Sequence, residues 1–231
     1  YVLNARGRTY NDLGRLAEAK ADFDRALELD SKYVPVYVDR ARLAYECGDF
    51  HAAERDANAA IELAPRDARA YTVRALVRVE SGEFAEAIDD CDRAISLNGR
   101  LAEPVATRGL AKAFAGDIEA GLEDCHAALR IDPDLPMTLV QRGRIMAAKG
   151  DGAAAVEDFT AALEINSRLM PALRARAKLF LDYEVVEDAL ADANDLVRLA
   201  PDSANHRAIR ASVYWAADET RQMLQDCERA L

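Results

Sequence analysis

Glycine recurs at a constant interval along most of this sequence. Five glycines lie 34 residues apart from one to the next: Gly14, Gly48, Gly82, Gly116 and Gly150. The same interval then reaches Glu184 and Asp218, where glycine is absent. Self-similarity at a fixed period of about 20 to 50 residues is typical of proteins that stack one supersecondary unit many times. A repetitive, curved stack is therefore expected, and not a globule.

Small residues recur around each of these seven turn positions. Five residues after them stand Ala19, Ala53, Ala87, Gly121, Ala155, Ala189 and Met223; twelve after them stand Ala26, Ala60, Ala94, Ala128, Ala162, Leu196 and Ala230; seven before them stand Gly7, Ala41, Ala75, Gly109, Gly143, Ala177 and Ala211. Small side chains at helical spacing let two antiparallel helices approach closely, and glycine tolerates the left-handed turn between them. Each period therefore predicts one helical hairpin, with helices over about 35–47 and 51–64 and their repeats.

Capping residues and prolines support these helix boundaries. Asp49, Asp117 and Asp151 directly follow the turn and predict N-caps of second helices. Pro35, Pro104, Pro136 and Pro171 stand where first helices begin, and Pro65, Pro133 and Pro201 where second helices end. Because Glu184 and Asp218 replace glycine, we expect looser turns in the sixth and seventh hairpins.

This pattern resembles the tetratricopeptide repeat family over the whole chain. The family's first-helix aromatic position holds Tyr10, Phe180 and Tyr214, and its second-helix aromatic position holds Phe23 and Phe159. Cysteine replaces the second-helix aromatic at Cys91, Cys125 and Cys227, and Gly152 replaces an apolar residue. The resemblance implies an all-α fold, an α-α superhelix of about seven hairpins that makes most of one turn. The expected hairpins are 1–33, 34–67, 68–101, 102–135, 136–169, 170–203 and 204–231, the first and last truncated.

Composition favours helices and limits the classes of partner. Of the residues, 51% are apolar but only 6% aromatic, with much alanine, a strong helix former. A net charge of −11 would repel nucleic acid and anionic membrane surfaces. No apolar run is long enough to cross a bilayer. We predict a soluble, cytoplasmic protein of bacterial origin; because the sequence starts without Met and reads as an excised piece, a periplasmic or extracytoplasmic location stays open.

Two charged positions recur in all seven periods. Eight residues before the turn stand Arg6, Arg40, Arg74, Arg108, Arg142, Arg176 and Arg210; eight after it stand Asp22, Asp56, Asp90, Asp124, Asp158, Asp192 and Asp226. The arginines are either a comb for an acidic ligand or the partners of the aspartates in a structural spine of ion pairs. We favour the spine, because arginine suits bidentate pairing with carboxylates at half-buried interfaces. The sequence does not tell whether each arginine pairs with the aspartate of its own repeat or with that of a neighbouring repeat.

Cysteine and histidine indicate neither a disulfide nor a metal site. Successive hairpins stack about 10 Å apart, whereas a disulfide needs Cα atoms within about 7 Å. Cys91 and Cys125 are therefore predicted to be buried thiols, and Cys47 is the candidate for an exposed one. His51, His126 and His206 occupy three different repeat positions, so none pair at the helical spacing of metal ligands. We predict no cofactor, and no enzyme activity, since no catalytic motif is present.

A candidate binding groove follows from the resemblance, which places the first helices along a concave surface. The residues expected to face it are Arg8, Arg42, Leu76, Leu110, Arg144, Lys178 and Ser212, extended by Val38, Val79, Phe114 and Val140 and by the charges of Arg69 and Arg174. They predict an exposed apolar floor with basic flanks, suited to a peptide with apolar anchors and acidic flanks. A groove without a ligand, in which arginine stems merely cover apolar surface, is the alternative.

Three functions are compatible with these features. The first is a protein-protein interaction scaffold that binds a peptide or protein segment in the groove. The second is a self-assembly element, with homo-oligomers formed through the array ends. The third is a non-catalytic arm of a larger multidomain enzyme or regulator. A clamp for a chaperone carboxylate is not expected, because the corresponding places carry Asn4, Arg8, Asp39, Arg69 and Val73.

Overall fold

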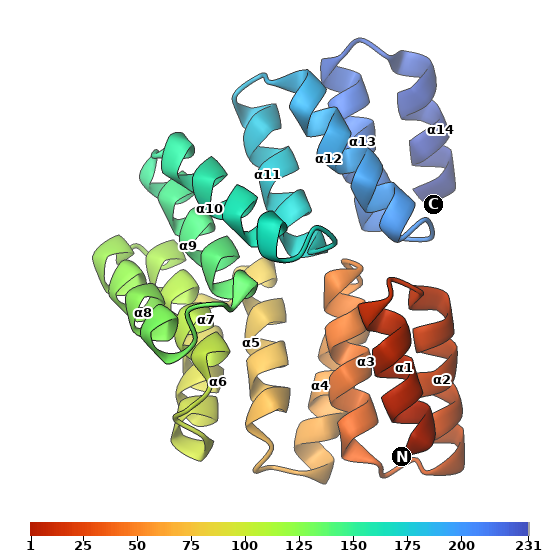
Figure 1. Ribbon diagram of the computed structural model, residues 1–231, viewed down its shortest axis with the longest axis vertical. Helices are drawn as coiled ribbons and strands as arrows, with labels where there is room; N and C mark the ends of the chain where they lie inside the picture. Colours follow the sequence, from red (N-terminus) through yellow and green to blue (C-terminus); the bar gives the residue numbers. More distant parts are fainter. Residues whose placement is uncertain (231) are drawn as a thin grey trace.

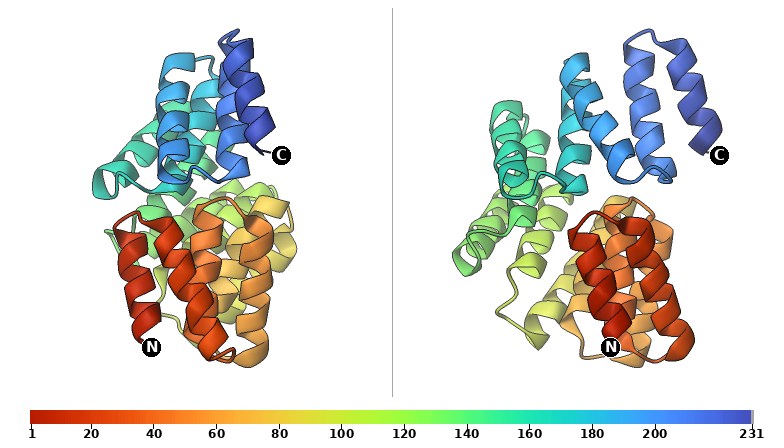
Figure 2. Two further views of the ribbon diagram at one scale, coloured as in Figure 1. Left: turned by 90° about the vertical axis from the view of Figure 1, so that its right-hand side faces the viewer. Right: turned by 45° about the vertical axis from the view of Figure 1, so that its right-hand side comes forward.

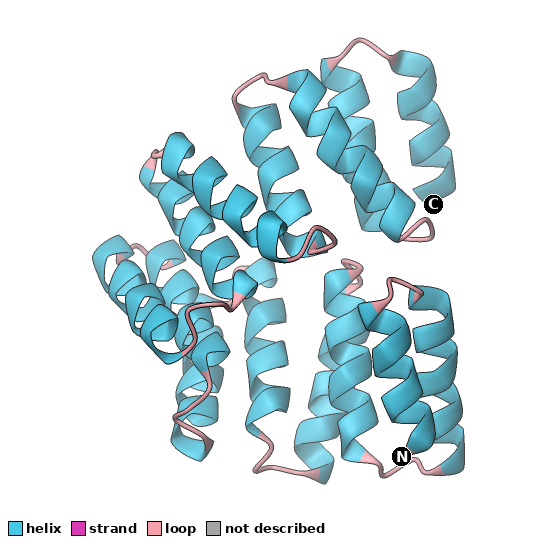
Figure 3. Cartoon of the chain, in the orientation of Figure 1, coloured by secondary structure: helices cyan, strands magenta, loops and turns pink. Residues whose placement is uncertain are grey.

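The computed structural model describes residues 1–230, which form fourteen α-helices joined by short connections and contain no strand (Figure 1, Figure 3). The helices are α1 (Val2–Asp12), α2 (Leu16–Leu29), α3 (Val34–Glu46), α4 (Phe50–Leu63), α5 (Ala68–Ser81), α6 (Phe84–Leu97), α7 (Ala102–Phe114), α8 (Ile118–Ile131), α9 (Pro136–Lys149), α10 (Gly152–Ile165), α11 (Met170–Asp182), α12 (Val186–Leu199), α13 (Ala204–Ala216) and α14 (Thr220–Ala230). None of these helices has the length and apolarity needed to cross a bilayer.

Consecutive helices pair into seven hairpins, and the hairpins stack side by side (Figure 1). The second hairpin, α3 and α4, begins and ends within one residue of the predicted ranges. The predicted caps are also confirmed, because Asp49, Asp117 and Asp151 each accept a hydrogen bond from a backbone N–H of the following helix. The all-α superhelix of about seven hairpins is thus the observed architecture.

Small residues bring the two helices of each hairpin into close contact. Ala19 and its equivalents Ala53, Ala87, Ala155 and Ala189 are all fully buried. The closest approach is in the fourth hairpin, where glycine stands on both helices. A Cβ atom added to Gly109 would lie 2.5 Å from the backbone oxygen of Gly121. These helices pack backbone against backbone.

Gly109→Ala is therefore expected to destabilise the protein by about 2 kcal/mol in chemical denaturation, because the new methyl group forces α7 and α8 apart. Gly99→Ala is the control, since a Cβ atom there meets nothing nearer than 3.6 Å. If both variants unfold at the same denaturant concentration as the wild type, the close approach of α7 and α8 is wrong.

The turns without glycine differ from expectation. Glu184 and Asp218 both adopt the left-handed conformation, with φ of 59°. Their hydrogen bonds match those of the glycine turns: the residue after the turn donates to a carbonyl five residues back at 2.8 Å, in Asp49, Val185 and Glu219 alike. The prediction of looser turns was wrong, because packing of the hairpin holds the turn and the residue accepts the strain.

Relief of this strain gives a prediction. Glu184→Gly and Asp218→Gly are each expected to raise the free energy of unfolding by about 0.5–1 kcal/mol. A left-handed conformation costs about 1–2 kcal/mol for a residue with a Cβ atom, and glycine removes this strain. Part of the stabilisation is lost, because glycine also makes the unfolded chain more flexible. Thermal melts of the two single variants measure it. Asp182→Gly, at a helical position in α11, should instead destabilise.

The recurring arginines and aspartates pair within hairpins, a choice that the sequence left open. In every hairpin Nε and Nη2 of the arginine donate to the two carboxylate oxygens of the aspartate sixteen residues later, at 2.5–2.9 Å. The seven aspartates are buried. These donors are occupied inside the protein and are not offered to an external acidic ligand.

The third donor of most of these arginines reaches the preceding hairpin. Nη1 of Arg40, Arg74, Arg108, Arg176 and Arg210 donates to Asp24, Asn58, Asp92, Thr160 and Asn194 respectively, at 2.6–3.1 Å. In the hairpin that precedes Arg142, His126 stands at the position where the other hairpins have these acceptors. The ion pairs therefore fix each hairpin internally and also set its register against its neighbour.

The stack curves more tightly than expected. The sixth and seventh hairpins return to lie next to the first and second, so that α11 and α13 stand above the ends of α1 to α4 (Figure 1, Figure 2). Two ion pairs span alternate hairpins on the inside of this curve: Arg42 pairs with Glu103 at 2.6 Å, and Arg144 pairs with Glu80 at 2.6 Å. By joining first helices that are not neighbours, these pairs stabilise the strong curvature.

Candidate functional site

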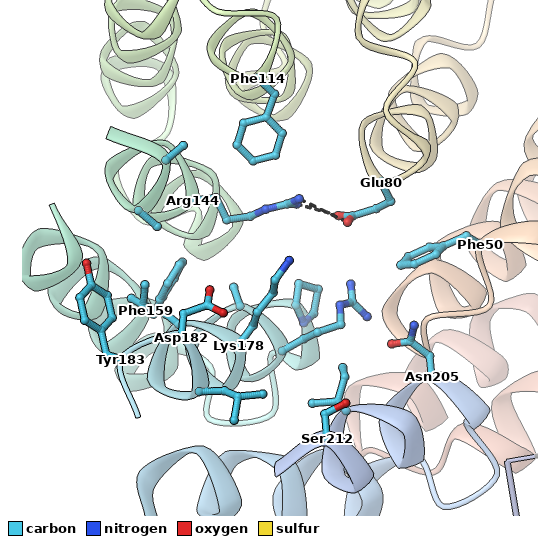
Figure 4. A pocket seen from close by; sticks show the side chains of 18 residues that line it. Phe50, Glu80, Phe114, Arg144, Phe159, Lys178, Asp182, Tyr183, Asn205 and Ser212 are labelled. Carbon is cyan, nitrogen blue, oxygen red and sulfur yellow. Dashed lines mark hydrogen bonds and ion pairs between the residues drawn. The ribbon is translucent and has the colours of Figure 1, made fainter. Parts of the chain in front are cut away.

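The inner face of the curve encloses a cavity of about 750 Å³ (Figure 4). Its lining comes from α4, α5, α7, α9, α10, α11 and α13, so the second to the seventh hairpins all contribute. The rings of Phe50 and Phe114 lie on different sides of it, and those of Phe159 and Tyr183 lie next to each other on another side (Figure 4). A concave site of this size with apolar walls and a few polar groups is typical of ligand-binding pockets.

One side of the cavity carries a satisfied ion pair. Arg144 donates to both carboxylate oxygens of Glu80, at 2.6 and 3.2 Å (Figure 4). The Tyr45 hydroxyl donates to the same carboxylate at 3.2 Å. Burial alone would raise the pKa of Glu80, but the charges of Arg144 and Arg174 outweigh it, so this pKa lies below its usual value. Glu80 is therefore ionised and already engaged.

The opposite side carries two cations that have no carboxylate partner among residues 1–230. They are Arg174 and Lys178, one turn apart on the inner face of α11. The guanidinium of Arg174 lies over the rings of Tyr45 and Phe50, 5.7 and 5.3 Å from their centroids, and makes one long hydrogen bond, of 3.4 Å, to the Glu46 carbonyl. Lys178 extends toward the middle of the cavity (Figure 4). Together these two side chains offer unused donors to a ligand.

Cation–π contacts hold Arg174 in a fixed place. Such contacts stabilise a guanidinium without using its hydrogen-bond donors in the ring plane. The other inward-facing arginines, Arg42 and Arg144, are each neutralised by a glutamate. Arg174 is thus a half-buried, oriented cation that forms no ion pair with a carboxylate in the described part of the chain.

Sequence comparisons support the repeat pattern. One model of the tetratricopeptide repeat matches residues 38–102, and a second matches residues 1–33. These matches identify tetratricopeptide repeats in the first three hairpins. No curated protein sequence matches this tetratricopeptide array significantly.

Solved structures show the same fold. The array is similar to a tetratricopeptide repeat protein from Parabacteroides merdae, with 17% identity, a TM-score of 0.58, and coverage of 99% of this chain and 90% of the other. It is similar to a chain of the APC/C hetero-tetramer Cut9-Hcn1, with 16% identity, a TM-score of 0.61 and 97% of this chain covered. The array spans only 45% of that chain. MamA gives 22% identity, a TM-score of 0.50, and coverage of 72% and 91%.

The aliphatic residues predicted to form an exposed groove floor are buried instead. Leu76, Val79, Leu110, Val140 and Val38 are at most 3% exposed. They pack between neighbouring first helices, because the tight curvature brings those helices together. The prediction of an exposed aliphatic floor was wrong, and substitutions such as Leu110→Asp would test folding and not binding.

The predicted basic flanks separate into three groups. Arg144, Arg174, Lys178 and Ser212 line the cavity together with Phe114. The guanidinium of Arg42 is occupied by its ion pair with Glu103. Arg69 pairs with Asp67 beside it, and Arg8 is exposed on α1; neither lines the cavity.

Sequence reasoning missed several cavity residues. Phe50 directly follows a capping aspartate on a second helix, Glu80 lies two residues before a turn glycine, and Asn205 begins α13. Asn205 packs against Gly48 of a hairpin far away in the sequence. The pattern of repeats gives no signal for such residues, because their place depends on how far the stack curves.

The exposure of the cysteine side chains differs in part from the prediction. Cys91 and Cys125 are buried free thiols, and burial raises the pKa of Cys125 to about 12. Cys47 is half-buried, and burial with the nearby Glu46 raises its pKa to about 12. The exposed thiol is Cys227 of α14, so the choice of Cys47 was wrong. Among residues 1–230 no group of three or more His, Cys, Asp or Glu side chains is placed to hold a metal ion.

Proposed function

We propose that the array, acting as one unit over residues 1–231, is a scaffold that binds a segment of another protein in the central cavity. The observation that carries this proposal is the pair Arg174 and Lys178, two cations that line an aromatic cavity and have no ion-pair partner within residues 1–230. A cavity that holds such cations suits a ligand that supplies negative charge. In this proposal the array itself carries out no reaction.

The chemistry of the lining specifies the segment. A carboxylate would take up the donors of Arg174 and Lys178, while an aromatic or aliphatic side chain would occupy the space between Phe114, Phe159 and Tyr183. The partner segment therefore combines an acidic residue with a nearby large apolar one. The similarity to a chain of the APC/C hetero-tetramer Cut9-Hcn1 supports binding of a protein partner by this fold.

A selection from a displayed library of random dodecapeptides tests the proposal. We expect the wild type to enrich peptides with an acidic residue close to an aromatic one, and Arg174→Glu/Lys178→Glu to bind them at least about tenfold more weakly in calorimetric titration. The matched control is Arg66→Glu/Arg130→Glu, which changes the net charge equally at exposed positions outside the cavity. Equal loss of affinity in both double variants would show that only the overall charge matters.

The single tryptophan offers an independent readout. Trp215 is 69% exposed and lies one turn after the cavity residue Ser212 on the same face of α13. A bound segment should shield its indole ring and shift its fluorescence to shorter wavelength. No shift at saturating peptide would place the bound segment away from this end of the cavity.

A further inference from the structure

The sixth and seventh hairpins touch the first and second across a contact that we call the seam. One side of the seam is formed by the turns Leu13–Leu16 and Glu46–Gly48 of the first two hairpins. The other side is formed by the loop and start of α11, at Arg168 and Met170, and by the start of α13, at Ser203 and Asn205. The partners are more than 120 residues apart in the sequence.

Three hydrogen bonds cross the seam, and each ends on a backbone carbonyl of a turn. The Ser203 hydroxyl donates to the Cys47 carbonyl at 2.6 Å. The guanidinium of Arg168 donates to the Leu13 carbonyl, and that of Arg174 donates to the Glu46 carbonyl at 3.4 Å. Leu16 and Cys47 also pack against the apolar cluster around Met170. These contacts are small in number beside the continuous packing between neighbouring hairpins.

The seam is also poorly filled. It contains a second cavity, of about 130 Å³, bordered by the carboxyl groups of Asp12 and Glu46. Burial raises the pKa of Glu46, so its charged form is disfavoured there. The Oδ1 atom of Asn205 is buried and accepts no hydrogen bond from the described residues, 1–230. Buried polar groups that are incompletely satisfied weaken an interface.

Opening the seam does not require unfolding of any hairpin. In a stacked repeat protein each repeat is stabilised by itself and by its neighbours in sequence. The seam joins hairpins that are not neighbours, so its contacts can break while every stacking interface stays intact. A small change of curvature, distributed over several interfaces, would separate the two sides.

The central cavity lies between the two sides of the seam. Phe50 and Glu80 face it from the second and third hairpins, whereas Arg174, Asn205 and Ser212 face it from the sixth and seventh. Arg174 takes part in both features, since it lines the cavity and donates across the seam. A segment in the cavity can contact both sides at once only when the seam is closed, which gives it a higher affinity for the closed form.

We propose that the seam is a gate: the superhelix opens between Ser203 and Cys47 to admit a partner segment from the side and closes over it. This regulation of access rests on the proposed function for its purpose, but the opening itself belongs to the free protein. An internal segment of a folded partner can then enter the cavity from the side, without passing end-first through the closed superhelix.

Pulsed electron paramagnetic resonance measures the opening directly. Spin labels at Ala17→Cys and Ser167→Cys, both exposed and on opposite sides of the seam, are introduced in the Cys47→Ala/Cys227→Ser background, because Cys47 lies at the seam and would become accessible on opening. The remaining thiols, Cys91 and Cys125, stay unlabelled because both are buried. We expect the free wild type to show a major short distance and a minor longer one.

Variants at the seam decide whether the minor population is the open gate. Arg168→Ala/Ser203→Ala, which removes two of the hydrogen bonds, should increase the longer-distance fraction at least about threefold. The control is Asp67→Ala, which removes the equivalent helix cap of the third hairpin without touching the seam. Circular dichroism melts check that both variants remain folded. One narrow distance, unchanged in the seam variant while that variant stays folded, would overturn the gate.

The selected peptides provide the second arm of the experiment. Saturating peptide should move the double-labelled wild type and the seam variant toward the short distance, because the bound segment contacts both sides. A peptide that binds and leaves the longer-distance fraction of the seam variant unchanged would contradict closure over the ligand. If no peptide binds, the proposed function fails, whereas the distances of the free protein still accept or reject the gate.

Discussion

Asp124→Ala is expected to lower the free energy of unfolding by about 3 kcal/mol, measured by urea denaturation. Asp124 accepts hydrogen bonds from Arg108 at 2.7 and 2.8 Å and forms a further ion pair with Lys112 at 2.8 Å. Its side chain is only 11% exposed. Removal of one partner of a buried pair leaves the other charge desolvated without compensation, which costs about 3–5 kcal/mol. The partial exposure of Arg108 places this case at the lower end.

Glu123→Ala is the matched control, since it removes a neighbouring carboxylate that is exposed on the same helix. Such a surface change is expected to stay within about 0.5 kcal/mol of the wild type. Arg108→Ala should resemble Asp124→Ala, because it also removes the link to Asp92 of the preceding hairpin. Equal small effects of all three substitutions would show that the spine of ion pairs does not support the stack.

Acidification is expected to destabilise the protein through His206. This side chain is fully buried at the start of α13, and neither ring nitrogen makes a hydrogen bond to any of residues 1–230. Burial, with a further contribution from the nearby charge of Arg174, lowers the pKa of His206 from 6.5 to about 4. Folding therefore requires the neutral ring. Below pH 6.5 the unfolded chain binds a proton that the folded protein does not, so stability falls as the pH drops toward 4.

Urea denaturation at several pH values measures this effect. The expected loss from His206 relative to pH 7 is about 2 kcal/mol at pH 5 and about 3 kcal/mol at pH 4. His206→Leu should lack this component, while the remaining titrating groups are the same in both proteins. If the wild type and His206→Leu lose the same stability between pH 7 and pH 5, His206 is not held in its neutral form.

The sequence was sufficient to predict the repeated unit. Turn glycines such as Gly48 and small residues such as Ala53 recur because each hairpin meets the same local requirements: a left-handed turn and a close helix contact. The same holds for Arg40 and Asp56, whose pairing lies inside one hairpin. Features confined to one repeat or to two neighbours leave a periodic signal.

The turns at Glu184 and Asp218 show where local preference fails. A glutamate or aspartate disfavours the left-handed conformation, and so a looser turn was expected. The hairpin nevertheless keeps its geometry, because the packing of the two helices stabilises the turn by more than the strain of about 1–2 kcal/mol costs.

The cavity could be predicted only in part, because it depends on the curvature of the whole stack. Leu110 and Val79 occupy positions that would face an open groove, yet the tight curve buries them. The pairs of Arg42 with Glu103 and of Arg144 with Glu80 link alternate hairpins through glutamates that stand at different repeat positions. No periodic pattern contains that information, and the same limit applies to the seam.

Photo-crosslinking from inside and outside the curve determines where a bound peptide lies on the array. Benzoylphenylalanine is placed at Ser212, an exposed position that lines the cavity, or at Glu123, an exposed position on a second helix outside it. We expect a selected peptide to crosslink to position 212 and not to position 123, and Arg174→Glu/Lys178→Glu to abolish the product. A peptide that binds but crosslinks only from position 123 would show that the partner is bound on the outer helices, and the central cavity would then not be the binding site.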